Sequence, residues 1–85
     1  LWLTRALVAR KMYEYPKARA YVYKAMALKQ LPQVYEELIW LDLETGNKKE
    51  AREIIFYVLN TFAFRVNDES FYDKMRDLQK GLTEA

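Results

Sequence analysis

The chain has 85 residues, of which 52% are hydrophobic, 15% aromatic and 31% charged, with only two Gly and two Pro. This composition excludes a disordered, linker-type or collagen-like chain, and the length allows one small domain. The chain has no Cys, which excludes disulfides and thiolate metal sites, and its formal net charge is only +2.

The first two predicted helices cover residues 1–12 and about 16–30. In both, apolar residues recur at helical spacing, and the pattern breaks between them at residues 13–16. Pro16 suits the first turn of a helix, because its missing N–H would have no partner there. Leu31 and Pro32 predict a second helix boundary of the same kind. The residue before a proline is disfavoured in the helical conformation, and the proline can begin the next helix.

The third and fourth predicted helices form a hairpin around residues 45–47. Gly46 can adopt the left-handed conformation that ends a helix. Asn47 can cap the next helix, and Glu50 can reach back to complete a capping box. The apolar residues on both sides of this turn recur with the helical period, which predicts two amphipathic helices rather than strands.

A fifth helix is predicted after Asn67, Asp68 and Glu69, which supply a cap and an acidic first turn. This helix carries one apolar stripe that fades at Gly81. Its opposite face is charged, as a helix that covers the open end of a stack requires. The stripe consists of Phe71, Tyr72, Met75, Leu78 and Leu82.

The first hairpin aligns with the second when Trp2 is placed on Tyr35, which indicates an internal repeat. The other matched pairs are Ala6 and Ile39, Ala18 and Ala51, Arg19 and Arg52, Val22 and Ile55, Tyr23 and Phe56, and Ala25 and Val58. This repeat predicts an all-α fold of two antiparallel helical hairpins, at about 1–31 and 32–66. We expect them to stack as a short right-handed solenoid, with a capping helix and tail at 67–85.

Each repeat consists of two helices, with an aromatic residue early in the first helix, a small residue in the second and, in the second repeat, Gly in the turn. This pattern and the spacing between Trp2 and Tyr35 resemble the tetratricopeptide repeat (TPR). The run 40–44, followed by Gly46, Asn47 and residues 51–54, is also similar to the half-a-tetratricopeptide (HAT) repeats of RNA-processing factors. The chain departs from the TPR pattern at Ile39, where the family has a small residue, and at Asp42, where it has a tyrosine. The family's end-of-repeat proline is also missing after Phe62.

The resemblance implies that the first helix of each repeat lines a groove that binds a partner peptide or helix. In the second repeat, Glu36, Trp40, Leu43 and Glu44 share one helix face, separate from the face that should pack inward. The equivalent stripe one repeat earlier is Leu3, Leu7, Arg10 and Lys11. Together they predict an apolar groove floor with charged edges, in which Trp40 anchors the partner; the alternative is that Trp40 is simply buried.

The resemblance also excludes one class of ligand. The best-known groove of the family clamps the C-terminal carboxylate of chaperone tails with Lys and Asn. Those positions are occupied here by Leu3 and Leu7. We therefore do not expect this chain to bind such tails.

Catalysis is not expected, because the chain has no His, no Cys and a single Ser, Ser70, which is placed to cap a helix. No cofactor or metal is expected, and the acidic pairs 36–37 and 50–53 are interpreted as solvated helix faces. The longest nearly apolar run, residues 54–64, is well below the roughly 20 residues of a membrane span. No secretory signal is visible and the lack of Cys fits the cytoplasm, which is the expected location.

The charges are distributed unevenly along the chain. Residues 1–30 hold seven basic residues and one acidic residue, for +6, whereas residues 31–85 hold seven and eleven, for −4. Such a dipole predicts self-association of the basic N-terminal end with an acidic C-terminal end, or docking to an acidic partner. The alternative is that these charges only keep the domain soluble.

We expect a non-catalytic protein-binding or scaffold module. The alternative function is an RNA-processing assembly factor that contacts RNA through its basic N-terminal half. The net charge of +2 argues against that alternative, so nucleic acid is the weaker partner class.

Overall fold

The computed structural model describes residues 1–61 and 69–84. Within these two ranges every regular element is a helix, which confirms the predicted all-α class. The helices are α1 (Trp2–Lys11), α2 (Tyr15–Leu28), α3 (Pro32–Glu44), α4 (Lys48–Thr61) and α5 (Glu69–Glu84). Most bounds lie within a residue or two of those predicted, but α5 continues through Gly81 to Glu84. The predicted cap at Asn67 and Asp68 lies outside the described residues.

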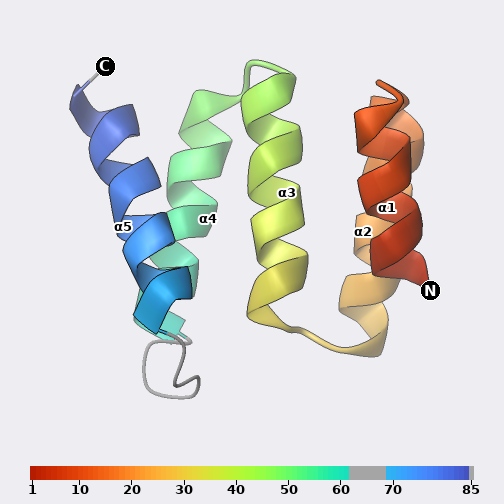
Figure 1. Ribbon diagram of the computed structural model, residues 1–85, viewed down its shortest axis with the longest axis horizontal. Helices are drawn as coiled ribbons and strands as arrows, with labels where there is room; N and C mark the ends of the chain where they lie inside the picture. The colour runs from red at the N-terminus through yellow and green to blue at the C-terminus, as the bar shows by residue number, and fades with distance from the viewer. Residues whose placement is uncertain (62–68, 85) are drawn as a thin grey trace.

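The helices form a row with the two chain ends at its opposite ends (Figure 1). Helices α1 and α2 pack along each other at one end, and α4 and α5 do so at the other. Helix α3 lies between them and contacts α1, α2 and α4. None of the helices in the described ranges is long and apolar enough to cross a membrane.

The turn between α1 and α2 closes with two backbone hydrogen bonds. The N–H of Tyr13 donates to the carbonyl of Arg10 at 3.0 Å, and the N–H of Glu14 donates to that of Ala9 at 2.9 Å. These bonds form a Schellman motif, in which the residue after the C-cap takes the left-handed conformation. Tyr13 takes that conformation, with a φ of 63°.

The turn between α3 and α4 has the same pattern. The N–H of Gly46 donates to the carbonyl of Leu43 at 3.3 Å, and the N–H of Asn47 donates to that of Asp42 at 2.7 Å. Gly46 has a φ of 83°, the left-handed conformation that its position in the sequence predicts. The side-chain amide of Asn47 donates to the hydroxyl of Thr45 at 3.1 Å and so stiffens the turn itself.

The shift that places Trp2 on Tyr35 in the sequence also relates the elements of the structure, and we call it the repeat offset. It carries both ends of α2 onto both ends of α4, and the end of α1 onto the end of α3. Buried positions recur at the same interval and continue into α5. They include the series Ala6, Ile39 and Tyr72 and the series Ala9, Asp42 and Met75. Helix α5 therefore buries residues at positions equivalent, by the repeat offset, to buried residues of α1 and α3.

The core consists of two clusters joined by shared side chains. The first lies among α1, α2 and α3 and is rich in alanine, which lets these helices approach closely. Its members are Ala6, Ala9, Ala18, Val22, Ala25, Val34, Leu38 and Leu41. The second lies among α3, α4 and α5 and comprises Tyr35, Ile39, Ala51, Ile55, Val58, Phe71, Tyr72 and Met75. Met26 and Ile54 pack against both clusters.

The apolar stripe of α2 is not buried along its whole length. Leu28 falls on the apolar stripe of α2 in the sequence, yet it is 75% exposed. It is the last residue of α2, and the extended backbone of Lys29 ends the helix there. The buried face of α2 therefore ends with Ala25 and Met26, whereas the apolar stripe in the sequence continues to Leu28.

Candidate partner-binding site

A pocket with a volume of about 340 Å³ lies between α1 and α3. Its lining brings together five of the predicted site residues from two helices that are far apart in the sequence. These are Leu3, Leu7, Arg10, Glu36 and Trp40. The packing of α1 against α3 places the two stripes side by side, and the leucines and the indole supply an apolar floor.

Three predicted site residues do not line this pocket. Lys11 is exposed at the end of α1, and Glu44 turns its carboxylate toward Arg10. Leu43 is half-buried and packs against the second core cluster. It lies on the side of α3 that packs against this cluster, whereas Trp40, one turn earlier, lines the pocket.

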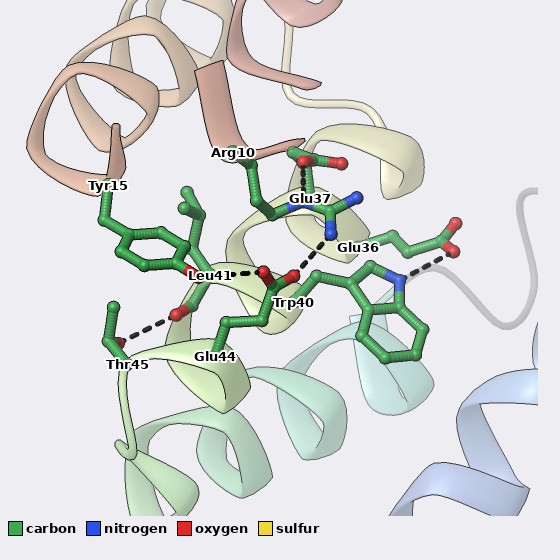
Figure 2. A network of polar contacts seen from close by, with 8 residues as sticks. All are labelled: Arg10, Tyr15, Glu36, Glu37, Trp40, Leu41, Glu44 and Thr45. Atoms are coloured by element: carbon green, nitrogen blue, oxygen red, sulfur yellow. Dashed lines mark hydrogen bonds and ion pairs between the residues drawn. The ribbon is translucent and has the colours of Figure 1, made fainter. Parts of the chain in front are cut away.

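Trp40 is half-buried and belongs to neither core cluster. Its indole N–H donates to Glu36 Oε2 at 3.3 Å, as Figure 2 shows. The same carboxylate oxygen accepts a hydrogen bond from Lys74 Nζ of α5 at 3.1 Å. These contacts restrain the indole ring, which lines the pocket.

The guanidinium of Arg10 is bound by two carboxylates of α3. Its Nε donates to Glu37 and its Nη1 to Glu44, and the Tyr15 hydroxyl adds a 3.2 Å hydrogen bond to Glu44 (Figure 2). Burial works against the charge on Arg10, but the two carboxylates outweigh it and raise the pKa of the guanidinium. Arg10 was predicted as a charged edge of the groove; in the structure its charge is already neutralised.

A second ion pair joins α2 to α3. Arg19 Nη2 donates to Asp42 Oδ1 at 2.9 Å, and Asp42 is only 2% exposed. Burial again opposes the charged arginine, and the bond to Asp42 outweighs it, so the pKa of Arg19 is raised. In the part of the chain that the structure describes, no buried side-chain nitrogen or oxygen lacks a hydrogen-bond partner.

The interpretation of Glu36 and Glu37 as a solvated face is wrong. Glu37 is 7% exposed and paired, and Glu36 bonds both Trp40 and Lys74. A signal for Glu37 was present in the sequence, because it lies three residues after Val34 and four before Leu41 on the face of α3 that meets the first hairpin. A carboxylate on such a face needs a cation, and the sequence pattern did not show which one.

The groove offers a ligand an apolar floor and charges that are compensated within the protein. That composition suits an apolar side chain of a peptide or helix, which would displace water without breaking an ion pair. Among residues 1–61 and 69–84, no group of three or more His, Cys, Asp or Glu side chains is placed to hold a metal ion.

No family model, curated protein or solved structure matches this chain. The helices and the pocket between α1 and α3 are the features that bear on its function.

Proposed function

We propose that the chain is a non-catalytic protein-binding module of the TPR-like class, TPR or HAT. In this proposal, residues 1–31 and 32–66 are two repeats stacked as a short right-handed solenoid, and residues 67–85 cap it. The repeat offset shared by the helix bounds, the two turns and the buried positions supports the assignment. The contacts of α3 with α1, α2 and α4 are compatible with such a stack.

The partner is a peptide or helix that places an apolar side chain in the pocket between α1 and α3. The observation that carries this proposal is the meeting of Leu3 and Leu7 with Trp40 in one concavity. Tryptophans held rigidly in a partly apolar pocket are frequent anchors of binding energy. Because Arg10 is already paired, the partner needs no acidic group for this pocket.

Replacement of the anchor tests the proposal. Trp40→Ala should weaken binding of a partner recovered with the wild-type chain by more than about 2 kcal/mol in calorimetry. The thermal midpoint should change little, because Trp40 lies outside both core clusters. Phe56→Ala is the matched control, since Phe56 is 62% exposed on α4 and does not line this pocket. A variant that melts much earlier would show that Trp40 is structural.

The RNA-processing alternative has one observation in its favour. Arg5 Cζ and Lys24 Nζ lie 4.9 Å and 4.5 Å from the centre of the Trp2 ring, so a basic and aromatic cluster is present in the N-terminal half. Retention on a nucleic-acid column distinguishes the two functions. A chain that makes several phosphate contacts is released steeply between low and moderate salt, and a protein-binding module is not retained.

A further inference from the structure

Helices α1 and α2 form one end of the row (Figure 1). Residues of these two helices and of the turn between them line a second pocket, of about 370 Å³. We call this surface the open face and define it by Arg5, Val8, Met12, Lys17 and Tyr21, which all line that pocket. We propose that the open face binds a helical hairpin of a partner protein that carries acidic side chains beside an apolar stripe.

The open face is equivalent by the repeat offset to the surface of α3 and α4 that packs on the first hairpin. A pocket of about 310 Å³ lies at the seam between the two hairpins, and α2 contributes Arg19 and Tyr23 to it. Five of its remaining positions are related by the repeat offset to five positions of the open-face pocket. The pairs include Arg5 and Leu38, Lys17 and Glu50, and Tyr21 and Ile54. The open face thus has lining positions equivalent to those of α3 and α4 at the seam, and no helix among the described residues packs on it.

The apolar residues of the open face are uncovered where their counterparts are covered. Val8 is 51% exposed, whereas Leu41, the equivalent residue of α3, is 0% exposed. Met12, at the end of the same helix, is 61% exposed. Because the seam buries Leu41 by packing a helical hairpin on it, the same kind of element fits on Val8.

The open-face pocket is more basic than the seam pocket. Arg5 and Lys17 outnumber Glu14 in the open-face pocket, whereas Asp42, Glu50 and Glu53 outnumber Arg19 at the seam. Lys17 pairs with Glu14 at 3.6 Å, which leaves Arg5 as the cation of this pocket without an ion pair among the described residues.

At the seam, Asp42 of α3 pairs with Arg19 of α2, and Glu50 of α4 lines the same pocket. The equivalents on the open face are Ala9 and Lys17. A hairpin that docks here therefore needs an acidic side chain in the place that Arg19 takes at the seam.

Two cations near Trp2 strengthen this requirement. Arg5 and Lys24 both lie over the ring of Trp2, and neither has an ion-pair partner among the residues that the structure describes. Two cations beside one ring make the potential at this end of the row more positive, which favours an acidic group on the partner. A second copy of this chain fits less well, because its exposed α5 side mixes Asp73 and Asp77 with Arg76 and Lys80.

The test uses two synthetic helical hairpins with the same apolar stripe, one flanked by Glu and the other by Lys. Each is titrated into the isotopically labelled full chain and followed by amide chemical shifts. The Glu hairpin should shift resonances of α1 and α2 and bind at least about tenfold more tightly than the Lys hairpin. Its affinity should fall several-fold between about 50 and 300 mM salt, because exposed charges are screened.

Variants of the chain identify the surface. Val8→Asp should weaken binding of the Glu hairpin about tenfold or more, whereas Phe56→Asp, at a comparably exposed apolar position on α4, should not. The double variant Arg5→Glu with Lys17→Glu should reverse the preference toward the Lys hairpin, which no loss of folding could produce. Trp40→Ala should bind like the wild type, which keeps this proposal separate from the groove.

Five results would overturn the proposal. These are equal affinity for the two hairpins, shifts confined to α3, α4 and α5, and an unchanged affinity in Val8→Asp. The fourth is tighter binding of a single-stranded oligouridylate to the same resonances, which would assign the open face to RNA. Sedimentation of the chain alone provides a further check: a dimer that Val8→Asp abolishes would make a second copy the occupant and would also overturn the proposal.

Discussion

Arg10 and Arg19 connect the first hairpin to α3 by neutralising its two buried carboxylates, Glu37 and Asp42. A carboxylate removed from water costs several kcal/mol unless a cation and hydrogen bonds compensate it. Each pair therefore favours the packing in which the arginine and its carboxylate meet. The two pairs place α1 and α2 on α3 in a defined register.

Removal of one partner should be costly, and removal of both should not. Arg10→Met leaves Glu37 buried without its cation and should lower the free energy of unfolding in urea by about 3 kcal/mol. Adding Glu37→Leu should recover most of that loss. Lys17→Met breaks an exposed pair with Glu14 and should cost less than about 0.5 kcal/mol. Additive effects of Arg10→Met and Glu37→Leu would contradict this account.

Tyr35 should make stability depend on alkaline pH. Burial, together with a hydrogen bond to Tyr57, raises the pKa of Tyr35 above its ordinary value of 10.0. A group whose pKa is higher in the folded state contributes full stability below the unfolded pKa and loses it as the pH rises through the folded one. The unfolding free energy should therefore fall above about pH 10, and Tyr35→Phe should show a smaller fall. Identical pH profiles for the two proteins would exclude this role.

At the scale of elements, the two hairpins use one turn design with different residues at the left-handed position. Gly46 occupies it in the second turn and Tyr13 in the first. This conformation costs a residue with a Cβ about 1 kcal/mol or more, whereas it costs glycine almost nothing. The α1–α2 turn therefore stores strain that the α3–α4 turn avoids.

Opposite substitutions in the two turns should have opposite effects. Tyr13→Gly should raise the free energy of unfolding by about 0.5 to 1 kcal/mol, because it relieves the strain at an exposed site. Gly46→Ala should lower it by about 1 kcal/mol. A Cβ at Gly46 would meet no atom within 4 Å, so that cost is conformational. Thermal melts of the two variants check both signs, and a destabilised Tyr13→Gly would show that its ring contact with Tyr15 matters more.

At the scale of the whole molecule, Met26 and Ile54 couple the two core clusters. Helix α5 completes the second cluster with Phe71, Tyr72 and Met75, and α1 completes the first. A small domain of this size gains its stability from few buried side chains, so the loss of contacts in one cluster should weaken the entire chain.

Met75→Ala tests this coupling. Met75 is 0% exposed, and its truncation should cost about 2 to 4 kcal/mol. Trp2 and Trp40 lie on α1 and α3, so tryptophan fluorescence reports from outside α5. Fluorescence and far-ultraviolet circular dichroism should shift together in one transition. Met12→Ala, at a 61% exposed position, should change stability by less than about 0.5 kcal/mol. Two separate transitions would show that the clusters unfold independently.

Local signals in the sequence were sufficient to predict the five helices, the glycine turn and the helix starts at the two prolines. These features depend on neighbours within a few residues, and periodicity and turn chemistry encode them. Five of the residues that line the candidate pocket could also be predicted in this way, because residues such as Leu3, Leu7 and Trp40 lie on helix faces that the period defines.

Which of those faces meet is a property of the packed molecule. Packing places Leu43 against the second cluster, leaves Leu28 exposed and pairs Glu37 with Arg10. Each of these outcomes depends on contacts between helices, and a helix that is amphipathic by its period does not specify which neighbour covers which part of its surface. The burial of a charge depends on the same contacts, because it is tolerated only where packing brings a counter-charge from another helix.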